Sequence, residues 1–179
     1  QGYKFQVSFE KEQLPVFEYK IEDIEITKTI CMEHLKNTVG IDYKIKNGKK
    51  HSKLILAPIM NFRDIHGINN NHLYNIEQKI IGKKIEVKID NNRPVYINIS
   101  DGTYIEHFND TFFNMFYVEE QKRGFEPVEN LIVPGRFEIE LEPKEEKEIS
   151  VICSLEDNIE ELDARAIITN EIARLGLEI

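Results

Sequence analysis

Alternation of apolar and polar residues runs through most of the chain and predicts β-strands. The segments YKFQVSF at 3–9 and TVGIDYKIK at 38–46 each place their apolar side chains at every second position. Because successive side chains of a strand point to opposite faces of a sheet, each segment has one apolar and one polar face. Further strand-like segments lie at 16–21, 24–30, 53–60, 79–90, 94–100, 103–108, 112–120, 136–142 and 147–155. The series predicts an all-β, antiparallel sandwich rather than a parallel α/β sheet.

Short turn motifs separate these strands. Asn47-Gly48 and Asp101-Gly102 are strong hairpin signals, and Asn91-Asn92 predicts a further turn. The segment KLILAPIM at 53–60 carries no charge after its first residue. It therefore predicts a strand that is buried on both faces.

The C-terminal segment has a different pattern. Apolar residues recur near helical spacing after Asp157, which forms a candidate capping box with Glu160. Gly176 is a candidate stop for this helix. We expect a β-sandwich domain at 1–155 and an amphipathic helix or linker at 156–179 that leads toward a further domain.

Composition and charge narrow the function classes. The 179 residues carry 32 acidic and 23 basic side chains, and this balance argues against a nucleic-acid partner because phosphate backbones favour clustered cations. Lys83-Lys84 is expected to be a solvated strand end. The apolar runs are too short to span a bilayer, and the first residues predict a strand rather than a secretion signal. Cys31 and Cys153 lie in apolar segments, so we expect buried free thiols and a cytoplasmic protein.

Arg63, Asp64 and His66 form the first candidate site, directly after the apolar segment at 53–60. In a regular strand, Asp64 and His66 would share one face and Arg63 would point to the other. An Asp–His pair can orient an imidazole for base chemistry, but no third member of a triad is evident. Asp-x-His also supplies too few ligands for a metal ion, so we expect no metal site and no cofactor. The alternative is an ion pair with hydrogen bonds at a strand end.

Tyr117, Glu119, Glu120 and Arg123 form the second candidate site, after an aromatic segment. Aromatic faces combined with carboxylate and guanidinium groups suit a sugar. The alternative is that the aromatic residues are core and the charges are solvated. No pair of acids stands out for glycoside hydrolysis, and the five histidines are scattered. The residues alone therefore indicate an all-β domain without a demonstrable active site.

Several segments, taken in order, resemble the N-terminal domain of the bacterial and archaeal type of glycogen debranching enzyme, the amylo-α-1,6-glucosidase family. They are FEYKIEDIEITKTICM (17–32), NTVGIDYKI (37–45), LILAPIMNFRDIHG (54–67), YVEEQKRGFEPVENLIVPGRFEIEL (117–141) and the trailing helix with Arg174. The most specific pieces are P-x-x-N-F-R-D-x-H and the E-x-x-x-R-G run that ends in P-G.

The resemblance implies a β-supersandwich of the galactose mutarotase-like type that packs against a C-terminal (α/α)6-barrel. In the family, the barrel carries the catalytic acids and cleaves α-1,6-glucosidic branch stubs of glycogen. The family's opening stretch, with its Arg-x-Tyr-His-Gly motif, would precede Gln1, and the barrel would follow Ile179. We therefore expect a fragment truncated at its N-terminus, without catalytic residues, cofactor or membrane contact.

The expected partners are the barrel of the same polypeptide and an α-glucan, either glycogen or limit dextrin. The candidate residues for the domain interface or the rim of the substrate cleft are Arg63, Asp64, His66, Tyr117, Glu119, Glu120 and Arg123.

Two other functions remain open. A free-standing carbohydrate-binding module would need solvent-exposed aromatic residues, and the chain contains no Trp. An aldose mutarotase would need a histidine acid and a carboxylate base across one sugar pocket. The candidates for that pair are His66 or His107 with Glu119 or Glu120. This third function rests on analogy of fold.

Overall fold

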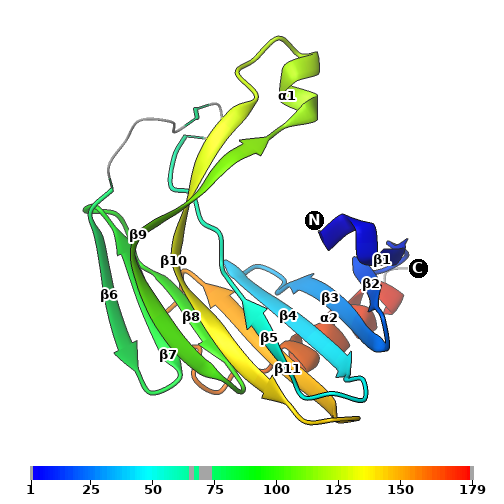
Figure 1. Cartoon of the computed structure of the whole chain (residues 1–179). Coiled ribbons are helices and arrows are strands. Elements are labelled where there is room, and N and C mark those ends of the chain that lie inside the picture. The colour runs from blue at the N-terminus through cyan, green and yellow to red at the C-terminus, as the bar shows by residue number, and fades with distance from the viewer. Residues whose placement is uncertain (1, 65–66, 69–73, 178–179) are drawn as a thin grey trace.

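Two antiparallel β-sheets face each other in the computed structural model, which describes residues 2–64, 67–68 and 74–177 (Figure 1). The large sheet consists of β1 (Gln6–Glu10), β2 (Val16–Ile21), β3 (Ile24–Met32), β4 (Thr38–Lys46), β6 (Ile76–Ile81), β7 (Lys84–Ile89), β8 (Val95–Ile99) and β11 (Glu146–Ser154). The small sheet consists of β5 (Ser52–Leu56), β9 (Thr103–Phe116) and β10 (Val128–Leu141). A 3-10 helix, η1 (Gly2–Phe5), precedes β1. The prediction of an all-β, antiparallel sandwich is confirmed.

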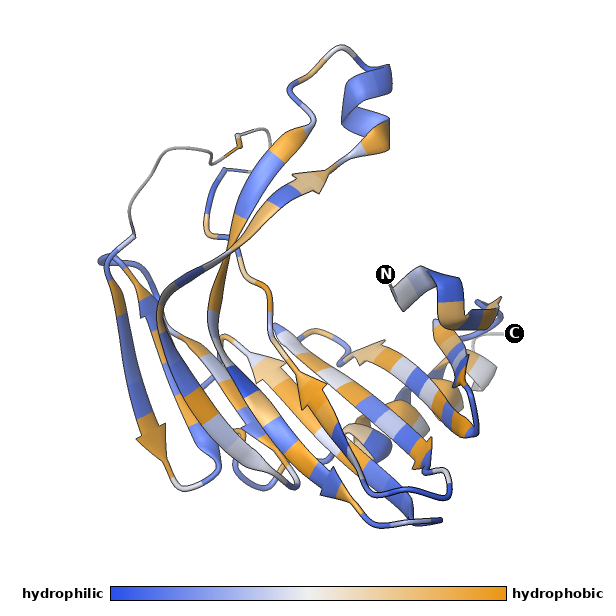
Figure 2. Cartoon of the chain, in the orientation of Figure 1, coloured by the Kyte–Doolittle hydropathy of each residue, from blue (hydrophilic) through white to orange (hydrophobic). Residues whose placement is uncertain are grey.

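The strand order explains where the core lies. The large sheet has the order β1-β2-β3-β4-β11-β8-β7-β6, and the small sheet has the order β5-β10-β9. Along β10, Phe137, Ile139 and Leu141 are buried and alternate with polar residues, as the colours of Figure 2 show for most strands. These side chains meet isoleucines and valines of the large sheet, including Ile85, Val87, Ile97 and Ile149. Each such fully buried side chain contributes about 1.5–3 kcal/mol of transfer free energy.

The helix α2 (Ala164–Leu177) packs on the outer face of the large sheet. A second apolar cluster joins it to the strands and consists of Cys31, Ile152, Ile159, Ala164 and Ile167. A Cβ atom built on Gly40 would lie only 3.0 Å from the Cα of Ala164. The absence of a side chain at Gly40 therefore allows the close approach of helix and sheet.

The start and end of α2 differ from the sequence-based prediction. Asp163 rather than Asp157 caps the helix, since its Oδ1 accepts a hydrogen bond of 2.8 Å from the backbone N–H of Arg165. Asp157 instead forms an ion pair of 2.6 Å with Lys84, which is buried and not solvated as expected. Gly176 lies inside the helix and does not stop it. The two cysteines are free thiols, as predicted, and Cys31 is buried.

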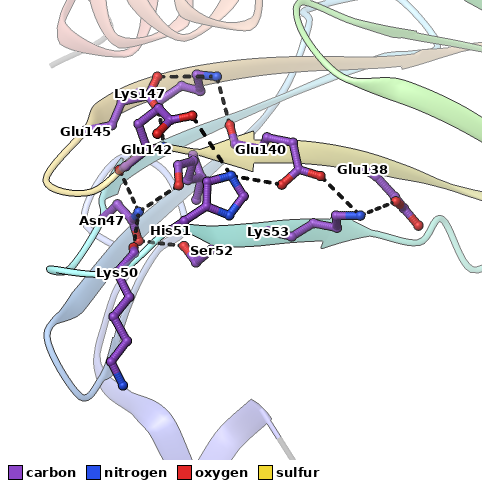
Figure 3. A network of polar contacts seen from close by, with 11 residues as sticks. Asn47, Lys50, His51, Ser52, Lys53, Glu138, Glu140, Glu142, Glu145 and Lys147 are labelled. Atoms are coloured by element: carbon purple, nitrogen blue, oxygen red, sulfur yellow. Dashed lines mark hydrogen bonds and ion pairs between the residues drawn. The ribbon is translucent and has the colours of Figure 1, made fainter.

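Two of the predicted hairpin turns connect the sheets instead of neighbouring strands. Asn47-Gly48 leads from β4 in the large sheet to β5 in the small sheet, and Asp101-Gly102 leads from β8 to β9. The buried Asn47 amide explains the first crossing, because it donates hydrogen bonds of 3.0 and 2.7 Å to the carbonyls of Leu141 and Glu142 (Figure 3). Asn91-Asn92 does join neighbouring strands, β7 and β8.

The strand predicted at 53–60 is shorter than expected and is not buried on both faces. It ends at Leu56, and Ile55 is 53% exposed. Pro58, which lacks a backbone N–H, prevents the pairing from continuing regularly, and only Met60 forms an isolated bridge to Ile132.

The predicted strand at 112–120 ends early and is followed by a helix. β9 ends at Phe116, and the short helix α1 (Val118–Lys122) follows. The distal ends of β9 and β10 project from the sandwich and carry α1 at their tip (Figure 1). We call this projection, residues 112–129, the arm.

Candidate functional site

A buried carboxylate lies within the arm, near the start of α1. Glu129 is the second residue of β10, and its side chain is fully buried. Its neighbours are Arg63, from the segment after β5, and Tyr117, which directly precedes α1. A buried charge of this kind requires a charged or strongly hydrogen-bonding partner.

Arg63 and Tyr117 both bind the Glu129 carboxylate. The Nη2 of Arg63 donates to Oε2 of Glu129 at 3.0 Å, and its Nε donates to Oε1. The guanidinium therefore binds both carboxylate oxygens. The Tyr117 hydroxyl donates to Oε2 at 2.9 Å. The Nη1 of Arg63 also donates to the backbone carbonyl of Asp64 at 2.9 Å. We call Arg63, Tyr117 and Glu129 the Arg63 cluster. It joins the segment after β5 to the two chain segments of the arm that flank α1.

The electrostatics of the Arg63 cluster favour a permanently charged guanidinium. The hydrogen bond to Glu129 raises the pKa of Arg63. Burial, followed by the hydrogen bond to Glu129, raises the pKa of Tyr117, which therefore stays a neutral donor. The cluster is thus suited to holding a fixed geometry rather than to exchanging protons near neutral pH.

A pocket of about 530 Å³ opens beside the Arg63 cluster. Its described lining residues are Arg63, Gly67, Ile68, Tyr117, Glu120, Phe125 and Glu126. The lining combines one guanidinium, two carboxylates and two aromatic rings. Such a set can contact the hydroxyls and the apolar faces of a sugar, or a polar protein surface.

The structure brings three of the predicted site residues together in one pocket. Arg63, Tyr117 and Glu120 line the same pocket. Glu119 forms an exposed ion pair of 2.7 Å with Lys122. Arg123 forms an exposed ion pair of 3.5 Å with Glu120, so both carboxylates of α1 have a partner within the helix or its cap.

The segment that follows β5 does not have the strand geometry assumed for its side chains. The chain is not a strand at Arg63 and Asp64, so the prediction of opposite faces does not apply there. The Asp64 side chain is exposed, and its backbone carbonyl accepts a hydrogen bond of 3.0 Å from the N–H of Gly67. His66 lies outside the described residues.

Glu129 is the site residue that sequence reasoning missed. In β10 the positions 129, 131, 133, 137, 139 and 141 are all buried. A glutamate in phase with Leu131, Val133 and Phe137 was the signal that a buried partner must exist elsewhere in the chain.

His107 has other partners than the acids proposed for a mutarotase-like pair. Its Nδ1 lies 2.8 Å from Asp110 Oδ2, and its Nε2 lies 2.8 Å from Arg136 Nη1. Within the described residues, no group of three or more His, Cys, Asp or Glu side chains is arranged to hold a metal ion. No helix in that same part of the chain is long and apolar enough to cross a membrane.

Comparison with solved structures finds distant similarity. A putative kojibiose phosphorylase from the human microbiome matches with 12% identity and a TM-score of 0.42, over 92% of this chain and 20% of the other. A polysaccharide lyase matches with 13% identity and a TM-score of 0.44, over 93% of this chain and 24% of the other. The chain thus spans a quarter or less of the length of these two proteins. No curated protein matches the sequence significantly.

Comparison with protein families gives a more specific result. The model described as the glycogen debranching enzyme N terminal matches residues 1–148. The match includes the whole arm, the Arg63 cluster and all strands up to the start of β11. The chain therefore belongs to the family of glycogen debranching enzyme N-terminal domains.

Proposed function

We propose that this domain is the non-catalytic part of a glycogen debranching-type glycosidase, and that its arm docks on an (α/α)6 catalytic barrel of the same polypeptide. In that position the domain shapes the cleft that receives an α-glucan such as glycogen or limit dextrin. The family membership supports the class of enzyme, and the projecting arm is the observation that carries the docking role. In the same proposal, residues 156–179 connect this domain to the barrel.

The side chains of the arm support contact with another protein surface. Phe113 is 67% exposed and Phe125 is 64% exposed, and Phe112, Phe116 and Val118 are also exposed. Large apolar side chains gathered on one projection mark an interaction surface, since water contact with them is unfavourable. α1 adds exposed charges beside them, as the polar rim of a protein interface requires.

The Arg63 cluster supports the same role by fixing the arm beside the start of α1. Glu129 and Tyr117 lie on the two chain segments of the arm, and Arg63 joins them to the sandwich. A docking element that is held in place before binding loses less conformational entropy on association. The adjoining pocket then lies at the rim of the interface, where its carboxylates can accept hydrogen bonds from glucan hydroxyls.

Carbohydrate binding by the isolated domain is the second candidate function. The exposed ring of Phe125 lines the pocket together with Glu120 and Glu126. Exposed aromatic residues are therefore present, although none is a Trp. Calorimetric titration with maltoheptaose distinguishes the two candidates, because binding by the domain alone would favour the second.

A docking measurement tests the proposal. The chain is titrated with the separately produced barrel of the same polypeptide, and the variant Phe113→Ala/Phe125→Ala is compared with Ile81→Ala. Ile81 is a matched control, since it is an exposed apolar residue outside the arm, on β6, an edge strand of the large sheet. We expect the double variant to lose at least about thirtyfold in affinity, as for central aromatic residues of interfaces, and the control to bind normally. Equal binding of all three proteins would refute the docking role of the arm.

A further inference from the structure

A row of aromatic side chains on the inner face of the large sheet contains a lysine. In the strand register, Phe9 of β1 is opposite Phe17 of β2, Phe17 is opposite Lys28 of β3, and Lys28 is opposite Tyr43 of β4. Residues opposite each other on neighbouring strands point to the same face, so these four side chains form a continuous row. The rings of Phe9 and Phe17 are in contact, with centroids 4.7 Å apart.

The inner end of this row opens into a groove between the two sheets. The groove has a volume of about 740 Å³, which is within the range of roughly 300–1,000 Å³ for small-molecule sites. Its walls are Ile41, Tyr43 and Val151 from the large sheet and the segment 55–61 from the small-sheet side. Lys28 is the only charged residue among the described residues that line it.

The ammonium group of Lys28 has ring faces but no acid beside it. Its Nζ lies 5.9 Å from the Phe17 ring centroid and 5.7 Å from the Tyr43 centroid. Within the described residues no carboxylate forms an ion pair or hydrogen bond with it. Burial lowers the pKa of Lys28, and the cation–π contacts offset part of the lost hydration.

Lys84 is a second lysine of the large sheet whose ammonium group lies over an aromatic ring. Its Nζ lies 5.5 Å from the Tyr96 centroid. It is paired in addition with the carboxylates of Asp157 and Glu160. Lys28 therefore differs from Lys84 in lacking an anion, and the apolar groove beside it has space for one.

We propose that the groove between the sheets binds a small amphiphilic carboxylate, with the carboxylate on Lys28 and the apolar tail between the sheets. The ammonium supplies a charge-assisted hydrogen bond, which is strong in surroundings of low dielectric constant. Ile41, Leu56 and Met60 offer apolar contact to the tail. Tyr43 lines the groove next to Lys28, and burial raises its pKa to about 12, so the phenol stays neutral and does not repel an anion.

This site is separate from the surface that carries the proposed function. The groove and the pocket at the Arg63 cluster have no described lining residue in common. Loss of one function by mutation therefore leaves the other measurable, and the two proposals can fail independently.

Titration of the full chain with octanoate tests the proposal. Isothermal calorimetry gives the affinity, and ¹⁵N NMR shift changes give the location. Octan-1-ol and octylammonium serve as probes with the same tail and a neutral or positive head. We expect octanoate to bind at least about tenfold more tightly than either, with the largest shifts at Lys28, Tyr43 and Met60.

Two variants and one control identify the role of the charge. Lys28→Met is expected to raise the Kd of octanoate about tenfold or more and to change that of octan-1-ol less than threefold. Ile41→Glu places an acid on the wall of the groove, on the same face of the large sheet as Tyr43 and Lys28. It is expected to weaken octanoate binding similarly, even if Lys28→Met fails to fold. Lys44→Met is the control, because Lys44 is exposed, adjoins Tyr43 in β4 and points to the opposite face.

Three results would overturn the proposal. The first is equal affinity for the three probes, which would show that only the tail is bound. The second is unchanged octanoate binding by both groove variants. The third is shift changes that lie on the arm or on α2 instead of in the groove.

Discussion

Replacing Arg63 by methionine removes the guanidinium that holds the only fully buried glutamate found in the described part of the chain. The Glu129 side chain has 0% exposure, and that of Arg63 has 22%, so solvent cannot easily take the place of the lost partner. Breaking a buried ion pair from one side costs about 3–5 kcal/mol, because the remaining charge is uncompensated. Tyr117 keeps its hydrogen bond to the carboxylate, so we expect the free energy of unfolding to fall by about 3 kcal/mol.

Urea unfolding measures this loss. For a slope of up to about 3 kcal/mol per molar, the midpoint should fall by at least about 1 M. The double variant Arg63→Met/Glu129→Leu should recover most of the stability, because both charges are gone and an apolar pair takes their place. Arg123→Met is the control, since its ion pair with Glu120 is exposed and worth less than about 0.5 kcal/mol. A midpoint of Arg63→Met close to that of the control would refute the reasoning, as would simple additivity in the double variant.

Three further predictions concern contacts that stabilise the sandwich and the packing of α2 on it. Asn47→Ala should lower the free energy of unfolding by about 2–3 kcal/mol, because three backbone carbonyls lose their amide donor, and urea unfolding checks this. Gly40→Val should displace α2 from the sheet at a cost of about 1–3 kcal/mol, visible as faster amide exchange in α2. Arg174 lowers the pKa of Glu171, so its carboxylate stabilises the fold above the ordinary pKa of 4.5 and this contribution is lost as the pH falls through the folded value. Glu171→Gln should therefore be less stable than the native chain at pH 7 and equally stable in acid, as thermal unfolding across pH would show.

The strands were predictable from the sequence because alternation is a local property. The segments at 38–46 and 147–155, for example, became β4 and β11 with small changes of boundary. The assignment of strands to sheets was not predictable in the same way, because it depends on contacts between distant residues. Asn47-Gly48 has the sequence of a hairpin turn, but hydrogen bonds from Asn47 to the end of β10 direct the chain into the other sheet.

The candidate site was predictable only in part for a related reason. Arg63 and Tyr117 were recognised as candidates from their surroundings in the sequence, but their common partner is Glu129, which is 66 positions from Arg63. The aromatic segment before Tyr117 suggested a longer strand, whereas the chain turns into α1 and leaves Phe113 exposed on the arm. Periodicity shows which residues share a face, but it does not show that a pair of strands projects beyond the sheet that would cover it.

Glucose release from limit dextrin tests the central claim most directly. The chain alone, the proposed barrel produced separately and an equimolar mixture of the two are compared under the same conditions. The account predicts no release by the chain, weak release by the barrel and strong release by the mixture, with no gain when the chain carries Phe113→Ala/Phe125→Ala. Glucose release by the chain alone, or equal rates for the barrel and the mixture, would contradict a non-catalytic domain that shapes the cleft.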